Sequence, residues 1–283
     1  MELNKAVLFG QLIAAAYAVA PTDLTNQAGK VVEAGPAGAS ASYEVVTTIY
    51  ANDLATDMNP LRGKNIVSIG QILQASSAGD AVVVIRGTEG IEEWMQDAKF
   101  LAVPCPFFGS GGNTEDGFTD MYGSMTAGPG TAAPKLRDAL ANLHWKRPVT
   151  SLTICGHSLG GALATLLALD VAVNERTPFN TPAVYTYASP KTGDPLFATT
   201  YNHAVPNTVR VANRLDLVPK LPLPPLYDHV LGLFELNPVQ LGAPPKVLVK
   251  FDIPCEHFFN TYLHLLSLLM GGDILPLDPQ CVP

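Results

Sequence analysis

The sequence predicts an α/β fold, with a mostly parallel central sheet flanked by helices. Apolar, β-branched runs alternate with helix-forming runs through most of the chain, which is typical of strands joined by crossover helices. The run Ala81–Ile85 is apolar throughout, as expected of a strand buried on both faces. In the stretch Ser151–Leu169 a short strand, a glycine-rich turn and an Ala- and Leu-rich helix follow one another directly. Together these observations favour one sheet covered by helices.

At the N-terminus, the apolar stretch 2–20 is interpreted as a buried first helix. It also has features of a secretory signal, because Lys5 precedes an apolar run that ends in Ala18-Val19-Ala20. Glu2 and Gln11 fit a signal poorly, since one is acidic and the other interrupts the apolar run. We therefore expect a core helix of a soluble protein, and the compartment, secreted or cytoplasmic, stays open.

The remaining elements follow from residue type and from the positions of Gly and Pro. Residues 21–41 are rich in Gly, Pro, Ala and Thr and should form a loop. Strands are expected where β-branched residues cluster, at 43–50, 65–75, 81–85, 152–155, 182–187, 208–212 and 246–251. Helices are expected at 89–97, 118–125, 132–145, 159–173 and 257–270. The Pro- and Leu-rich residues 219–245 should form an irregular surface segment, and a single domain is expected over residues 1–283 because no linker divides the chain.

Composition limits the classes of function. The chain has 283 residues, of which 47% are hydrophobic and 15% charged, which is enough apolar material for a sizeable core. The net charge is −8 and no basic cluster occurs, so nucleic acid is not an expected partner, because phosphate binding needs clustered Lys and Arg. No apolar run reaches the roughly 18–20 residues that span a bilayer, so no transmembrane segment is expected.

The cysteines carry little signal for metal or redox chemistry. No Cys-x-x-Cys pair occurs, so neither a zinc knuckle nor a thioredoxin-like site is indicated. Cys155 lies on the expected strand beside the glycine-rich turn and should be a buried free thiol. One disulfide among Cys105, Cys255 and Cys281 is compatible with the sequence, which leaves the pairing open.

The glycine-rich turn carries the pattern G-x-S-x-G, with Ser158 between Gly156 and Gly160. A serine on a sharp strand-to-helix turn projects its hydroxyl away from the backbone, and the glycines leave room for a neighbouring histidine and a substrate carbonyl. The amide of Leu159 begins the helix, so it can donate to a developing oxyanion with the helix dipole behind it. The turn therefore predicts that Ser158 is a nucleophile, not an incidental turn serine.

A serine nucleophile needs a base, and the base needs an orienting acid. Asp216 follows the expected strand 208–212 and precedes a sharp Pro-rich turn, while His257 follows the last expected strand and opens the last expected helix. We interpret these two residues as the acid and the base. Competing acids are Asp170, Asp194, Asp228 and Asp252, and the rival base is His229.

The loop after the run Ala81–Ile85 should supply a second oxyanion donor, and Thr88 fits because its amide and hydroxyl can both donate. Residues 89–104 follow directly and are interpreted as a lid. Its apolar candidates recur at i, i+3 and i+4 and share one helix face: Ile91, Trp94 and Met95. At a lipid–water interface such a face can turn outward, although the same spacing is equally typical of a fixed helix that packs on the core.

Several motifs occur in an order that resembles the class 3 lipases, the family that includes the fungal triacylglycerol lipases. The matching blocks are Val84-Ile85-Arg86-Gly87-Thr88, Glu93-Trp94-Met95-Gln96-Asp97, Gly156–Gly161, Ser189–Pro195, residues 213–222, and Glu256-His257 with Tyr262. Asp116-Gly117-Phe118 resembles a further block, although the family usually has His where Asp116 stands. The resemblance covers roughly residues 80–265.

The resemblance implies an α/β-hydrolase fold and the hydrolysis of carboxylic esters, commonly acylglycerols. It implies Ser158 as nucleophile, Asp216 as acid, His257 as base, and the amides of Thr88 and Leu159 as the oxyanion hole, with no catalytic metal and no other cofactor. We expect a triacylglycerol lipase that can act at a lipid–water interface. A phospholipase A1, a short-chain or feruloyl-type esterase and an acyltransferase are alternatives of similar chemistry. A catalytically inactive hydrolase-fold protein that binds a protein partner is the alternative from another class, and the oligomeric state stays open.

Overall fold

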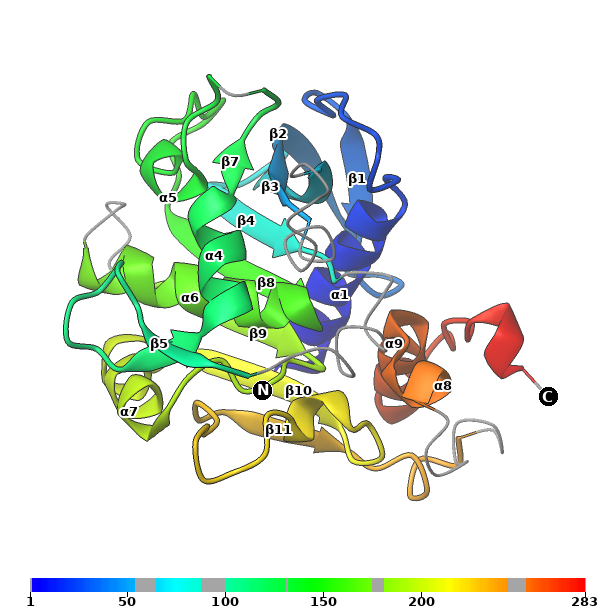
Figure 1. Ribbon diagram of the computed structural model, residues 1–283. Helices are drawn as coiled ribbons and strands as arrows, with labels where there is room; N and C mark the ends of the chain where they lie inside the picture. Colours follow the sequence, from blue (N-terminus) through cyan, green and yellow to red (C-terminus); the bar gives the residue numbers. More distant parts are fainter. Residues whose placement is uncertain are drawn as a thin grey trace.

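The computed structural model describes residues 2–53, 65–87, 100–130, 132–174, 181–243 and 253–282. A nine-stranded sheet runs through its centre in the order β1-β2-β3-β4-β8-β9-β10-β11, with β7 beside β2 (Figure 1). Its strands are β1 (Val31–Ala34), β2 (Ala41–Asn52), β3 (Ile66–Ala75), β4 (Asp80–Ile85), β7 (Thr126–Ala127), β8 (Ser151–His157), β9 (Ala183–Tyr187), β10 (Thr208–Asn213) and β11 (Leu233–Leu236). A separate pair lies outside this sheet and consists of β5 (Ala102–Pro104) and β6 (Asn113–Glu115).

The sheet has two halves that differ in strand direction. β1, β2, β3 and β4 pair antiparallel, whereas β4, β8, β9, β10 and β11 pair parallel. The carboxyl ends of the parallel strands therefore meet at one edge of the sheet, which is where ligands bind in open α/β sheets. The expected α/β architecture, a central sheet flanked by helices, is confirmed, and its parallel half positions the candidate site.

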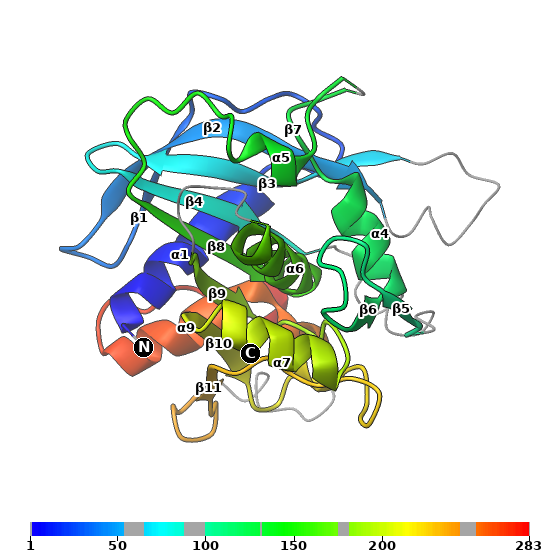
Figure 2. The ribbon, with the colours of Figure 1, turned by 90° about the vertical axis from the view of Figure 1, so that its left-hand side faces the viewer.

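Helices cover both faces of the sheet (Figure 2). One face carries α4 (Asp116–Ser124), α5 (Leu136–Ala139), α6 (Leu159–Val173) and α7 (Pro195–Ala204), and the other carries α1 (Leu3–Tyr17) and α9 (Phe259–Met270). The short helix α8 (Ile253–His257) directly precedes α9, and single 3₁₀ turns lie at Val218–Lys220 and Pro279–Cys281. Each face has its own apolar core, with α6 at the centre of one and α1 with α9 at the centre of the other.

The N-terminal helix is a core element. α1 completely buries Ala6, Leu12 and Ile13, and it packs against α9 and against β3 and β4. The helix ends at Tyr17, a little before the end of the expected range 2–20. In the part of the chain that the structure describes, no helix is both long and apolar enough to cross a bilayer.

The prediction of a helix over residues 132–145 is wrong for most of that range, because only Leu136–Ala139 are helical. The side chain of Gln74 on β3 provides competing partners for the backbone beyond them. Its Oε1 accepts the N–H of Lys146 at 3.0 Å, and its Nε2 donates to the carbonyl of Arg147 at 2.8 Å. These hydrogen bonds hold residues 146 and 147, just beyond the expected range, on the sheet.

Other expectations also need correction. Residues 21–41 are not entirely loop, since β1 pairs with β2 there. Within the segment 219–245, Leu233–Leu236 form β11 and extend the parallel half beside β10. α7 was not expected, although Asp194 caps its first turn by accepting the N–H of Phe197 at 2.8 Å. The strand expected at 246–251 lies outside the described residues.

Candidate active site

Ser158 lies at the junction of β8 and α6. β8 ends at His157 and α6 begins at Leu159, so Ser158 alone forms the turn. Its φ is +57°, in the left-handed region that residues other than glycine rarely adopt. Its N–H donates to the carbonyl of Tyr187 on β9 at 2.8 Å. Main-chain contacts therefore hold the serine in a strained conformation at the carboxyl edge of the sheet.

Close backbone contacts explain the glycines on either side of Ser158. A Cβ at Gly156 would lie 2.1 Å from the carbonyl oxygen of Gly160, and a Cβ at Gly160 would lie 2.3 Å from the carbonyl oxygen of Ile85. Both obstacles are backbone atoms, so a larger residue would push α6 away from the sheet. Glycine at these positions lets α6 pack closely on β4 and β8.

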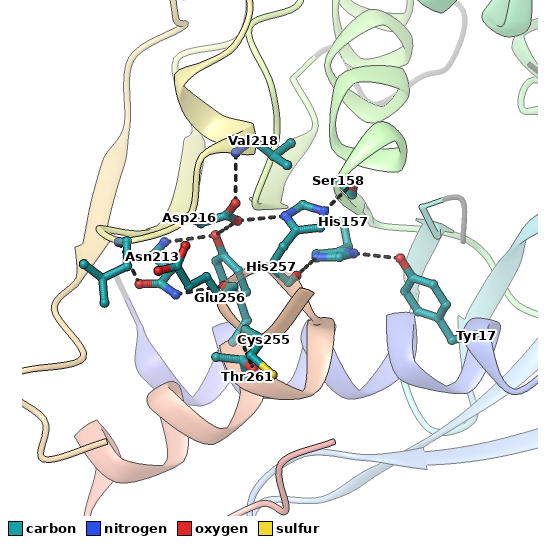
Figure 3. Close-up of polar contacts among 12 residues, drawn as sticks. Tyr17, His157, Ser158, Asn213, Asp216, Val218, Cys255, Glu256, His257 and Thr261 are labelled. Atoms are coloured by element: carbon teal, nitrogen blue, oxygen red, sulfur yellow. Dashed lines mark hydrogen bonds and ion pairs between the residues drawn. The ribbon is translucent and has the colours of Figure 1, made fainter. Parts of the chain in front are cut away.

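Ser158, His257 and Asp216 form one line of hydrogen bonds (Figure 3). His257 Nε2 lies 2.9 Å from Ser158 Oγ, and His257 Nδ1 lies 2.8 Å from Asp216 Oδ2. The side chains of Asp216 and His257 are 0% and 4% exposed. A carboxylate at Nδ1 keeps a proton on that nitrogen and leaves Nε2 free to accept the serine proton. The structure thus brings together the three residues that the sequence placed at the catalytic centre.

Asp216 follows β10, and described groups satisfy its buried carboxylate. Besides His257, the Tyr262 hydroxyl donates to Oδ2 at 2.7 Å and the Val218 N–H donates to Oδ1 at 2.9 Å. Burial, together with the neighbouring charge of Asp216, raises the pKa of Tyr262 well above its usual value, so this hydroxyl stays protonated and donates. These donors compensate for the loss of water around the carboxylate and orient it toward the imidazole.

His257 is the last residue of α8, whereas the sequence analysis expected it to open the final helix. Its backbone is anchored on both sides. Asn213, at the end of β10, donates from Nδ2 to the carbonyl of Glu256 at 2.8 Å. His157 Nε2 lies 3.1 Å from the carbonyl oxygen of His257 itself. His257 is therefore held by residues distant from it in sequence.

A disulfide joins Cys255, two residues before His257, to Cys281 near the C-terminus. The cross-link ties the helix that carries the imidazole to the 3₁₀ turn Pro279–Cys281. Cys105 and Cys155 are buried free thiols, and the latter lies on β8 as expected. The structure therefore resolves the pairing that the sequence left open.

The residues that hold His257 and Asp216 could not be identified from the sequence. Asn213, Tyr262 and His157 all stand in blocks that resemble the lipase family, but their local sequence does not indicate which groups they contact.

His229, the alternative base, makes a different contact. His229 Nε2 lies 2.5 Å from the carbonyl oxygen of Pro219. Burial, reinforced by the nearby charge of Arg210, lowers the pKa of His229 to about 3. A further histidine, His264, binds the carbonyl of Leu275 through Nδ1 at 2.8 Å. Both imidazoles thus satisfy backbone groups.

The rival acids have local structural partners. Asp170 accepts the hydroxyl of a buried tyrosine on α4 at 2.5 Å, and Asp194 caps α7. Asp228 accepts the N–H of the residue that follows it at 2.7 Å. Asp252 lies outside the described residues. The described rivals therefore act as caps or core partners, the common role of aspartate in turns and at helix ends.

The candidate oxyanion donors are described in part. Leu159 is the first residue of α6, so its N–H has no acceptor within the helix and lies beside Ser158. Thr88 lies outside the described residues, but the preceding Gly87 is placed, and a Cβ there would lie 2.9 Å from Ser158 Cβ. The chain that leads to Thr88 therefore passes directly beside the serine.

The lid candidates Ile91, Trp94 and Met95 lie outside the described residues, as does the stretch 88–99. Of the expected lid, only residues 100–104 are placed, and Ala102–Pro104 form β5, which pairs with β6. The end of the expected lid is therefore held by strand pairing.

A large cavity lies at the opposite edge of the sheet from Ser158. Its volume is about 1080 Å³, and it is lined by the first residues of parallel strands, among them Asp80, Ser151 and Ala183. Because it lies at the amino ends of these strands, it is separate from the line of Ser158, His257 and Asp216. Among the described residues, no group of three or more His, Cys, Asp or Glu side chains could hold a metal ion.

Comparisons with known proteins identify a family and a shared fold. The family model described as Lipase (class 3) matches residues 82–225, about half of the chain. Phospholipase A1-II 6 from Oryza sativa subsp. japonica is 28% identical, over 83% of this chain and 66% of that protein. The lipase of Rhizomucor miehei is 32% identical, over 53% of this chain and 40% of that protein. The chain thus spans less than two thirds of the length of either relative. A crystal structure of MDLA from Penicillium cyclopium shares the fold, with a TM-score of 0.60 and 23% identity over 83% of this chain and 80% of that one.

Proposed function

Because this chain belongs to the class 3 lipase family, we propose that it hydrolyses carboxylic esters of lipids through an acyl-enzyme formed on Ser158. The observation that carries the proposal is the buried line of hydrogen bonds from Asp216 through His257 to Ser158. An imidazole nitrogen 2.9 Å from the hydroxyl oxygen of a strained serine is the arrangement that nucleophilic acyl transfer needs.

In the acylation step, Ser158 Oγ attacks the carbonyl carbon of the ester while His257 Nε2 takes the hydroxyl proton. Asp216 stabilises the imidazolium that forms. The negatively charged oxygen of the tetrahedral intermediate accepts hydrogen bonds from two backbone N–H groups. One is that of Leu159, at the positive end of the α6 dipole, and the other is that of Thr88. As the intermediate collapses, the bond to the leaving alcohol breaks and His257 returns its proton to that oxygen.

In the deacylation step, water replaces the alcohol. The oxygen of the water attacks the acyl carbon while His257 takes a proton from that water. The same two amides stabilise the second oxyanion. The free acid leaves when the bond to Ser158 Oγ breaks and the serine regains its proton from His257. The chemistry needs only the side chains and amides named here.

Replacing Ser158 with Ala tests this mechanism. We expect turnover of an ester to fall by about 10⁶-fold, the loss typical when a catalytic serine is removed. The fold should persist, because the change deletes one oxygen. The measurement is hydrolysis of a soluble p-nitrophenyl ester, with thermal unfolding as the control for folding. Turnover within a few-fold of wild type in a folded Ser158→Ala variant would contradict the proposal.

For the substrate we propose triacylglycerols first, with residues 89–104 as a lid at the lipid–water interface. Phospholipase A1 activity is the second candidate, since the match to the rice phospholipase covers 83% of this chain and the match to the fungal lipase covers 53%. The test compares acid release from a triacylglycerol emulsion with release from vesicles of a phosphatidylcholine that carries a different acyl chain at each glycerol position. Faster release from the emulsion supports the first candidate. Faster release of the position-1 chain from vesicles supports the second.

A further inference from the structure

Tyr17 connects two parts of the candidate site that come from different strands. Its hydroxyl oxygen lies 2.8 Å from the backbone nitrogen of Gly87, just after β4, and 2.7 Å from Nδ1 of His157, at the end of β8. The other ring nitrogen of His157 lies 3.1 Å from the carbonyl oxygen of His257. A continuous run of hydrogen bonds therefore joins the peptide N–H of Gly87 to the peptide carbonyl of His257, and Figure 3 shows its part from Tyr17 to His257.

The direction of each hydrogen bond follows from the chemistry of the groups. A carbonyl only accepts, so His157 Nε2 carries a proton and donates to His257. Burial, reinforced by His257, lowers the pKa of His157 well below its usual value, so the ring is neutral and Nδ1 is an acceptor. Tyr17 therefore donates its hydroxyl proton to Nδ1 and accepts the N–H of Gly87 on an oxygen lone pair. Each donor in the run has its acceptor, so the four groups favour one arrangement.

Aromatic packing holds the two side chains of this run in place. The rings of His157 and Phe259 have centroids 4.7 Å apart, and the ring of Tyr17 stacks on Phe259 with a centroid distance of 5.8 Å. His157 is only 3% exposed. Tyr17 ends α1, whose buried face is anchored on the sheet and on α9. The core itself therefore fixes both hydrogen-bonding side chains.

Each end of the run lies next to a group that the proposed mechanism uses. Gly87 directly precedes Thr88, the proposed oxyanion donor, and it lies so close to Ser158 that a Cβ at Gly87 would come within 2.9 Å of the serine Cβ. His257, at the other end, is the proposed base. Catalytic groups need to be held within about 0.5 Å of their productive positions. A small displacement of either peptide would therefore lower turnover.

We propose that Tyr17 and His157 are positioning residues, which fix the peptide entering the oxyanion hole relative to the backbone of the base. The inference rests on the proposed function. The two side chains act through Gly87 and His257, not through contact with substrate. Because α1 supplies the tyrosine, the N-terminal helix becomes part of the support of the active site as well as of the core.

Tyr17→Phe tests this role, because it removes the hydroxyl and keeps the ring that stacks on Phe259. We expect kcat for a soluble p-nitrophenyl ester to fall about 10- to 100-fold, by analogy with the loss seen when the hydrogen-bonding partners of metal ligands are removed. KM should change less than about twofold, since an interaction that serves the transition state lowers kcat without weakening substrate binding. Tyr201→Phe is the matched control. It also removes a buried tyrosine hydroxyl, one that contacts Thr208 at 3.0 Å under the opposite face of the sheet, and it should leave kcat unchanged.

A double-mutant cycle asks whether Tyr17 acts through His157. In a His157→Asn background, Tyr17→Phe should cost less than about threefold in kcat, because the run is already broken. If His157→Asn does not fold, the rate of inactivation of Tyr17→Phe by a p-nitrophenyl phosphonate replaces the cycle. That rate should fall in proportion to kcat, since the reagent needs the same nucleophile, base and oxyanion hole.

The inference is overturned if folded Tyr17→Phe keeps the wild-type kcat, or if the two substitutions are fully additive in the cycle. An equal loss of kcat in Tyr201→Phe would overturn it too, because the loss would then reflect general loosening of the core. The inference is also overturned if the p-nitrophenyl phosphonate inactivates Tyr17→Phe at the wild-type rate. Failure of the proposed function would be seen separately, as ester hydrolysis that persists in Ser158→Ala.

Discussion

Ser158 and His257 face each other at 2.9 Å, yet the chain holds the two side chains by different means. The elbow, residues 156–161, is held by its own tight turn and by backbone contacts with the neighbouring strands. Its glycines let α6 pack on the sheet, and the N–H of Ser158 bonds to the adjacent strand. This geometry follows from the glycines of the turn together with backbone contacts to β4 and β9.

The base segment, residues 254–262, is held from outside. Asn213 anchors the carbonyl before the imidazole, Asp216 orients the imidazole, and a disulfide ties the segment to Cys281. These partners are all distant in sequence. The comparison teaches that Ser158 is positioned by backbone geometry and backbone contacts, whereas His257 depends on side-chain and disulfide contacts that can be removed one at a time.

The largest expected effect is loss of the base itself. His257→Ala should lower turnover by about 10⁶-fold, as for other triad histidines, because serine is a weak nucleophile without a base. His229→Ala is the control and should cost less than about tenfold, since His229 contacts the carbonyl of Pro219. Both are measured as kcat/KM for a soluble ester. A larger loss of kcat/KM in His229→Ala than in His257→Ala would show that the base lies in a different segment.

The next effect is expected from loss of the disulfide that ties the base segment to Cys281. Cys281→Ser breaks the cross-link and should lower the free energy of unfolding by about 3 kcal/mol, from the entropy of the opened loop. Urea unfolding measures this loss. Cys105→Ala is the control, because it alters a buried thiol without a cross-link and should cost about 1 kcal/mol. Equal losses in the two variants would mean that the cross-link adds no stability beyond that of a buried thiol.

A smaller effect is expected from one hydrogen bond to the acid. Tyr262→Phe removes the donor that lies 2.7 Å from Asp216 Oδ2, and a bond to a charged group is worth about 1.5–3 kcal/mol. We expect kcat to fall by about tenfold, the lower end of that range. Tyr50→Phe, in the antiparallel half, removes a hydroxyl that binds the carbonyl of Leu24 and should leave kcat unchanged. If the two variants kept the same kcat, Tyr262 would have no part in orienting the acid.

The same contrast explains what could be predicted from the sequence. The elbow and the buried strand that precedes it follow from apolar runs and glycine spacing, so Ser158 could be placed with its turn. His257 was inferred from its place after the last expected strand and from the resemblance to the lipase family, and its position at the end of α8 was not foreseen. The helix expected at 132–145 failed for a similar reason, since the backbone of residues 134–136 pairs with residues 125–127, and Gln74 binds the backbone just beyond the expected range. Contacts between remote segments decide where such helices begin and end, and these contacts cannot be predicted from local periodicity.

The most direct test of the central claim, that His257 activates Ser158, is covalent labelling with a p-nitrophenyl phosphonate. We expect one adduct, on the peptide that contains Ser158, identified by mass spectrometry after digestion. The labelling rate should fall by several orders of magnitude in His257→Ala and stay near wild type in His229→Ala, because the phosphonate is attacked only by an activated serine. An adduct on another residue, or labelling of Ser158 at an unchanged rate in His257→Ala, would contradict the account.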